Sequence, residues 1–238
     1  MLNIFKNLSI FNYLIVINII MTNIKYKHLI PSNMKIFAFV DMHGSLKALE
    51  KLVEKIKSHK PDMIVCAGDI TIFEQRLDYF IERLSSFKVP FLIIPGNHES
   101  ENELRKACSL FKNSYYLHKQ IYEKIDGYLF MGYGGGGFGN VDKDFEKIKK
   151  KFEKKIKKNK NKKKKKKIIL VTHQPPYKTS LDKLGNNYAG NKSYANFIKS
   201  NKIDLVICGH LHENIGKEDK IGNTFLINPG PYGKIIDI

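Results

Sequence analysis

Five short apolar runs in this chain each end directly on side chains of the kinds that bind metal ions. The runs span residues 35–40, 62–67, 91–94, 168–172 and 204–208. Continuous apolar runs of this length are typical of strands that are buried on both faces of a sheet. The residues that follow the runs are, in chain order, Asp41 and His43 in DMHG, Asp69 in GDI, Asn97 and His98 in GNHE, His173 in THQPP, and His210 and His212 in GHLH.

The segments between the first three runs have helical periodicity. Residues 45–59 and 74–87 each place apolar side chains at helical spacing, with charged residues between them. Ser100 and Glu103 form an S-x-x-E capping box, which predicts the start of a third helix. Strand–helix–strand alternation predicts a parallel core with right-handed crossovers. The carboxyl ends of such strands meet at one rim, where ligands bind.

The rest of the chain adds further predicted strands. Residues 114–133 are rich in Tyr and contain a Gly turn, which predicts antiparallel strands or a hairpin. Residues 224–228 predict another strand, and residues 194–200 predict a short helix. This order of elements indicates two sheets packed face to face, with helices outside them.

The side chains gathered at the predicted rim are carboxylates, an amide and imidazoles. This mixture of oxygen and nitrogen donors suits Mn, Fe, Zn or Ni rather than Ca or Mg alone. A single ion would not need so many ligands. Two ions about 3.5–4 Å apart, with one carboxylate bridging them, would use the whole set.

The five motifs DMHG, GDI, GNHE, THQPP and GHLH resemble the signatures of the calcineurin-like metallophosphoesterase superfamily. The resemblance is to its small, single-domain, prokaryotic-type members and covers residues 34–238. It implies an α/β (α+β) fold, a four-layer αββα sandwich with two mixed β-sheets flanked by helices. It also implies a two-metal site at the rim of the sheets.

The resemblance assigns a role to each rim residue. Asp41, His43 and His212 are expected to hold the first metal ion, Asn97, His173 and His210 the second, and Asp69 both. His98 is expected to be catalytic and to stand over the phosphate group, not to bind a metal ion. Both sites are expected to hold a divalent ion; manganese is favoured, and iron, zinc and nickel are alternatives.

The function implied is a phosphoesterase that hydrolyses phosphomonoesters or phosphodiesters by direct attack of a metal-bound hydroxide. A nuclease of the same superfamily is one alternative, and a scaffold protein on this fold is another. The full set of expected ligands favours the enzyme over the scaffold. The expected partner is a phosphate ester; the sequence makes no prediction of oligomeric state.

The net charge of +18 is concentrated in one segment, residues 143–167. This Lys-rich insertion holds sixteen lysines against three acidic residues, a net charge of +13. Residues 144–158 carry an apolar stripe at helical spacing, which predicts a helix docked on a sheet. Residues 159–167 are expected to be an overlong, low-complexity link. Binding of nucleic acid by this segment is an alternative that we do not favour, because no aromatic residues interrupt its final lysines.

Residues 1–33 are expected to be an N-terminal extension outside the phosphoesterase domain. The apolar stretch 8–21 is shorter than the roughly 20 residues that a membrane-spanning helix needs. Its alternatives are an extension of no structural use, an anchor or interfacial helix, and a signal peptide. The three cysteines are too few and too scattered for a disulfide framework. Reduced, buried thiols and a cytoplasmic location are therefore expected.

Overall fold

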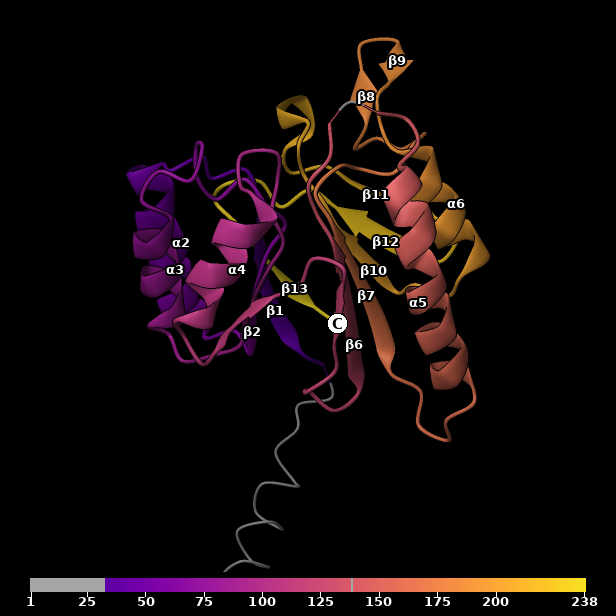
Figure 1. Ribbon diagram of the computed structural model, residues 1–238, viewed down its shortest axis with the longest axis horizontal. Helices are drawn as coiled ribbons and strands as arrows, with labels where there is room; N and C mark the ends of the chain where they lie inside the picture. Colours follow the sequence, from indigo (N-terminus) through magenta and orange to yellow (C-terminus); the bar gives the residue numbers. More distant parts are fainter. Residues whose placement is uncertain (1–32, 138) are drawn as a thin grey trace, which may run out of the picture. The chain divides into compact units, whose positions relative to one another are not determined.

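Two β-sheets carry the five predicted strands (Figure 1). The computed structural model describes residues 33–137 and 139–238. The predicted apolar stretch 8–21, and all but the last residue of the predicted extension, lie outside the described residues. The site and the two sheets, apart from the last residue of one edge strand, belong to a unit that comprises Lys35–Ile236.

The first sheet has the strand order β13-β1-β2-β3-β4. Its members are β1 (Lys35–Phe39), β2 (Met63–Cys66), β3 (Phe91–Ile93), β4 (Ser114–Tyr116) and β13 (Lys234–Asp237). Strands β1 to β4 pair in parallel. Phe39 lies opposite Cys66, and Cys66 opposite Ile93. The three predicted strands therefore end level with one another, and the loops after them start side by side.

The second sheet has the order β11-β12-β10-β7-β6-β5. Its members are β5 (Gln120–Tyr122), β6 (Tyr128–Tyr133), β7 (Lys167–Thr172), β10 (Leu205–Ile207), β11 (Glu218–Ile221) and β12 (Thr224–Ile227). The four central strands are parallel, and β11 and β5 are antiparallel edge strands. A separate pair, β8 (Lys183–Leu184) and β9 (Asn187–Tyr188), forms a small hairpin.

Helices cover the outer face of each sheet (Figure 1). Helices α2 (Leu46–His59), α3 (Leu77–Ser85) and α4 (Glu101–Ser109) share one apolar cluster with Phe37, Phe39 and other residues of the first sheet. Helices α5 (Lys143–Lys160) and α6 (Lys192–Ser200) share a second cluster with the other sheet. Ile36 and Ala38 alternate with the two phenylalanines and are equally buried. Because successive residues of a strand point to opposite faces of the sheet, both faces of β1 are buried, as the αββα sandwich requires.

The helix starts follow the sequence signals. The hydroxyl of Ser100 accepts a hydrogen bond from the Glu103 backbone N–H, which confirms the predicted cap of α4. The predicted helix 74–87 is shorter than expected. It begins at Leu77, because Phe73, Glu74 and Arg76 have left-handed backbone conformations, which a helix cannot contain.

The pairing of β4 corrects another expectation. Strand β4 does not form a hairpin with the strand that follows it. It pairs in parallel with β3, since α4 returns the chain to the same edge of the first sheet. Only β5 and β6 form the antiparallel pair that the composition of residues 114–133 predicts.

The lysine-rich segment is mostly regular structure. Phe145, Phe152 and Ile156 are buried, so the docked helix is confirmed. The link predicted for residues 159–167 is shorter than expected and spans residues 161–166, because α5 extends to Lys160 and β7 begins at Lys167. The Asn159 side chain closes the short turn by exchanging two hydrogen bonds, of 2.9 and 3.0 Å, with the backbone of Lys166.

All three cysteines are buried and have free thiols, as expected. Among residues 33–137 and 139–238, no helix has both the length and the apolar character that crossing a bilayer requires.

Candidate metal centre

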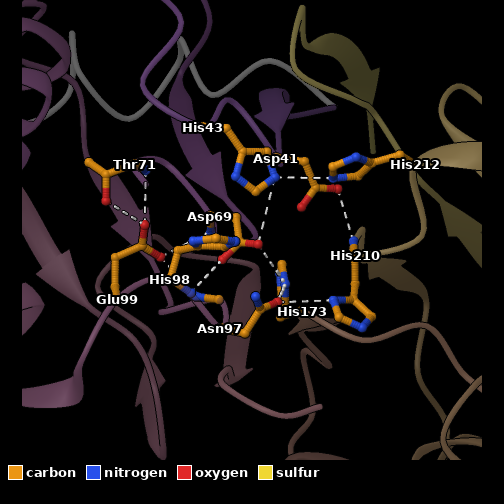
Figure 2. Close-up of polar contacts among 12 residues, drawn as sticks. Asp41, His43, Asp69, Thr71, Asn97, His98, Glu99, His173, His210 and His212 are labelled. Atoms are coloured by element: carbon orange, nitrogen blue, oxygen red, sulfur yellow. Dashed lines mark hydrogen bonds and ion pairs between the residues drawn. The ribbon is translucent and has the colours of Figure 1, made fainter. Parts of the chain in front are cut away.

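The eight rim residues lie together at the carboxyl ends of five strands, and their side chains point toward one another (Figure 2). Those that follow β1, β2 and β3 come from the first sheet, and those that follow β7 and β10 come from the second. Asp41, Asp69 and His173 are buried at the base of the cluster, whereas Asn97 and His212 are exposed. The cluster is therefore open to solvent on one side.

Asp41, His43 and His212 form the first group of donors. One ligand atom from each lies within 4.8 Å of the others. The Nε2 atoms of His43 and His212 are 3.1 Å apart. Oδ2 of Asp41 accepts a hydrogen bond from the backbone N–H of His210 at 2.9 Å. Oδ1 of Asp41 is buried and has no hydrogen-bond partner within the described part of the chain.

Asn97, His173 and His210 form the second group. The Asn97 Oδ1 atom lies 3.1 Å from Nε2 of His173 and 3.1 Å from Nδ1 of His210. Nδ1 of His173 lies 2.9 Å from the carbonyl oxygen of Ala67, which can only accept a hydrogen bond. Nδ1 therefore carries a proton, which leaves Nε2 as the nitrogen whose lone pair would face a metal ion bound at the site.

Asp69 lies between the two groups. Its Oδ2 atom is 3.7 Å from Nε2 of His43 and 3.3 Å from Nε2 of His173. Its Oδ1 atom accepts a hydrogen bond of 3.0 Å from the backbone N–H of His98. The Asp69 carboxylate thus faces both groups of donors, and the loop after β3 holds it in place.

The loops that carry these residues adopt unusual backbone conformations. Asp41, His43, Asp69 and His210 all have φ between 48° and 71°, in the left-handed region that residues other than glycine rarely occupy. Each such residue costs about 1–3 kcal/mol and persists only where the surroundings hold it. Here the loops hold one another. The Asp41 N–H donates to the carbonyl of Gly68, and that of His43 to Asp69.

Gly96 leaves room for the shared carboxylate. A Cβ atom at this position would lie 1.9 Å from Oδ1 of Asp69, so any larger residue would displace that side chain. The GDI and GNHE motifs therefore fit together only with glycine at this point.

The donor set fits divalent cations. Two ligands bound to one Zn-like ion at about 2.0–2.1 Å in tetrahedral geometry are about 3.3 Å apart. The His43–His212 pair, the two Asn97–histidine pairs and the two distances from Asp69 to histidines lie between 3.1 and 3.7 Å. The unpartnered Oδ1 of Asp41 is a buried anionic atom of the kind that a cation would satisfy. The residues present therefore fit metal binding.

The pattern of the family described as calcineurin-like phosphoesterase matches residues 34–214. The chain belongs to this family. The family is metal-dependent and its name implies phosphate-ester substrates, and the fold and the donor groups of this chain agree with that membership.

Similar proteins span most of this chain. It is 32% identical over 205 residues to the uncharacterised protein MJ1162 of Methanocaldococcus jannaschii, covering 83% of this chain and 88% of that protein. It is 28% identical over 214 residues to a probable glycerophosphodiester phosphodiesterase, GpdQ, of Arcobacter nitrofigilis, covering 84% and 72%. The crystal structure of TT1561 of Thermus thermophilus has the same fold, with a TM-score of 0.68, 19% identity and coverage of 87% and 99%.

Glu99 lies at the candidate metal centre, and the sequence alone assigned it no role. It is buried and accepts hydrogen bonds from the backbone N–H groups of Asp69, Thr71 and Gly96, and from the Thr71 hydroxyl, all at 2.8–3.0 Å (Figure 2). Its carboxylate therefore ties the loop after β2 to the loop after β3. The final residue of GNHE was the only signal of this role in the sequence.

His98 lies beside the first group of donors. Its ring packs edge-on against that of His43, with the ring centroids 4.9 Å apart. One of its ring nitrogens lies within 4.8 Å of ligand atoms of His43 and Asp69. On geometry alone, His98 can reach either a metal ion or a phosphate group bound there.

The buried carboxylates of the site favour a positive charge beside them. Burial raises the pKa of Asp41 to about 6. Burial also opposes ionisation of Asp69, but the hydrogen bond and charge of His173 hold the pKa of Asp69 at about 2. In return, despite its burial, His173 has its pKa raised to about 9 by Asp69 and Asp41. The carboxylates thus favour a cation at this point, whether a proton or a metal ion carries the charge.

Proposed function

We propose that this protein is a phosphoesterase that uses two divalent metal ions to hydrolyse phosphomonoesters or phosphodiesters. The observation that supports it most is the position of Asp69 Oδ2, 3.7 Å from the first group of donors and 3.3 Å from the second. A carboxylate that faces two groups of ligands is what a pair of adjacent cations requires.

In this proposal each group of donors holds one cation, and Asp69 contacts both. Asp41, His43 and His212 hold the first ion, and Asn97, His173 and His210 hold the second. When bound, two such cations lower the pKa of water and neutralise charge on a phosphate group. Manganese is the favoured ion, with iron, zinc and nickel as alternatives.

The protein's own residues position the reactants. The open side of the cluster, at Asn97 and His212, admits the phosphate ester. His98, held by the hydrogen bond from its backbone N–H to Asp69, donates a proton to the leaving oxygen. A proton donor placed in this way typically accelerates the reaction by about 10²–10⁴-fold.

The similarity to a probable glycerophosphodiester phosphodiesterase supports activity on diesters, without excluding monoesters. The test is a panel of substrates assayed with the protein reconstituted in turn with Mn, Ni, Zn and Fe. The panel contains a monoester, a diester, cyclic nucleotides and single-stranded nucleic acid. Hydrolysis of a small mono- or diester that requires added metal is the expected result.

Two other results would lead to different functions. Hydrolysis of nucleic acid alone would identify a nuclease, for which the lysines of α5 are the favourable feature. If the protein bound two metal ions and hydrolysed nothing in the panel, the scaffold alternative would replace the enzyme.

A further inference from the structure

Phe73 extends a row of rings that starts inside the candidate metal centre. The ring of His212 packs against that of His43 with centroids 5.0 Å apart, and the ring of His43 packs against that of His98 at 4.9 Å. The ring of Phe73 then packs against His98 at 4.8 Å, tilted by 55°. Phe73 is therefore one ring contact from the proposed proton donor.

The Phe73 ring is largely exposed where it stands. Its side chain is 74% exposed, the highest value among the large apolar residues described, and the preceding Ile72 is 41% exposed. The exposed surface of a benzene ring is unfavourable in water unless something covers it. Single exposed apolar residues are common, but this one contacts a residue of the site.

The loop that carries Phe73 has a strained backbone conformation. Phe73, Glu74 and Arg76 have φ of 47°, 64° and 57°, each in the left-handed region. Strain of this kind concentrates at sites of ligand binding and catalysis. The loop is fixed on both sides of the ring. Before it, Thr71 donates two hydrogen bonds to Glu99; after it, the Glu74 carboxylate accepts one of 2.7 Å from the Ser100 N–H.

Resting on the proposed function, we propose that Phe73 determines specificity by contacting the leaving group of the phosphate ester. His98 donates its proton to the leaving oxygen, so the rest of the leaving group lies on the side of the site where His98 and Phe73 stand. A flat aromatic group, such as a nucleobase, covers the exposed ring. The substrate class is therefore phosphate esters whose alcohol carries such a group.

The chain contains no Trp, so binding can be followed by the fluorescence of an introduced Trp without relying on a measured rate of hydrolysis. Phe73→Trp places the chain's single Trp at the proposed contact, and Leu110→Trp places it at an exposed position after α4 as the matched control. Each zinc-loaded variant is titrated with adenosine 5′-monophosphate and with ribose 5-phosphate, which lacks the base. We expect the adenine compound alone to change the fluorescence of Phe73→Trp, and neither compound to change that of Leu110→Trp. Equal responses to both compounds, or none, would overturn the proposal.

Kinetics then test selection. Adenosine 5′-monophosphate and ribose 5-phosphate, and the methyl diesters of both, are compared because each pair differs only by the base. The stacking of a base on an aromatic side chain is worth about tenfold or more in affinity. The parent protein should therefore prefer the base-carrying member by about tenfold. Phe73→Ala should remove this preference by raising KM for the base-carrying member, and Phe73→Tyr should keep the preference.

Three outcomes separate this inference from others. Phe73→Ala that slows both members of a pair equally would show a general role in the site and overturn the proposal. Loss of a dimer on Phe73→Ala, measured by sedimentation, would assign the ring to contact with a second copy and also overturn it. If no phosphate ester is hydrolysed by any variant, the proposed function fails, and the fluorescence titration still decides whether Phe73 binds the base.

Discussion

The Nε2 atoms of His43 and His212 lie 3.1 Å apart, although 169 positions separate the two residues in the chain. At this distance either one ring donates its proton to the other, or both lone pairs face a shared cation. The second arrangement links the first sheet to the second through a metal ion. Metal binding should then contribute to the stability of the fold as well as to the reaction.

Removal of the metal ions should therefore destabilise the protein. Ligands that bind only the folded state, at about 100 times their Kd, add about 2.7 kcal/mol to its stability. For a chain of this size that corresponds to about 5–10 °C in Tm. Calorimetry of the manganese-loaded and EDTA-treated protein measures the difference, and equal Tm values would contradict a metal link between the sheets.

Replacement of Asp69 by Asn should abolish both metal binding and turnover, because the Asp69 carboxylate faces both groups of donors. Elemental analysis should find fewer than one ion per chain instead of two, and kcat should fall below detection. Asp78→Asn, at an exposed position in α3, is the matched control and should keep both ions. Retention of two ions by Asp69→Asn would remove the bridging role.

Replacement of His98 by Asn separates its two geometric options. As a proton donor, His98 is dispensable for metal binding, so the variant should keep two ions while kcat falls by about 10²–10⁴-fold. Loss of an ion would make His98 a ligand. An unchanged rate on phosphate esters would leave it without a role in the reaction.

Replacement of Glu99 by Gln should loosen the site without removing a proposed ligand. The amide NH₂ would face backbone N–H donors, which leaves at least one of them unsatisfied and costs about 1–3 kcal/mol. Metal affinity should fall by about 10–100-fold, as for other groups that orient ligands. Urea unfolding and metal titration measure the two effects; a variant as stable and as tight-binding as the parent would show that the link is dispensable.

His118 predicts one component of the pH dependence of stability. Burial lowers its pKa from 6.5 to about 4, opposed by Glu101. Its Nδ1 accepts a hydrogen bond of 2.7 Å from the Gly134 N–H, so Nε2 carries the proton and donates to Glu101 at 3.1 Å. Lys119 and Arg105 also face this pair and disfavour a charged imidazole.

Because the folded state resists protonation of His118, the unfolded chain binds more protons between about pH 4 and 6.5. Stability therefore falls as the pH is lowered through this window, by up to about 1.4 kcal/mol per pH unit for this group. Urea unfolding of the parent and His118→Gln across the window should show the steeper decline in the parent. Parallel pH profiles would contradict a neutral, buried imidazole.

The sequence predicted the strands of the site and the residues that converge there because both signals are local. Each apolar run determines a buried strand, and the motif that follows it travels with the strand's carboxyl end. The membership of β4 in the first sheet was not predictable in this way, since its own residues do not specify which strand it pairs with. The same is true of the left-handed conformations of Asp41 and Asp69, which depend on hydrogen bonds between loops far apart in the chain.

Glu99 and Phe73 show a second limit. A buried carboxylate that accepts only backbone and hydroxyl hydrogen bonds leaves no pattern of partners in a single sequence. Phe73 directly precedes residues 74–87, which are predicted as an amphipathic helix, and nothing in the sequence distinguishes it from any other apolar residue at the end of a loop. Both roles become visible only when the loops after β2 and β3 are seen together.

The most direct test is anomalous diffraction from crystals of the protein grown with manganese. Two peaks about 3.5–4 Å apart are expected. One should lie among Asp41, His43 and His212, the other among Asn97, His173 and His210, with the Asp69 carboxylate touching both. A single peak, or two peaks too far apart for one carboxylate to reach, would contradict the two-metal centre.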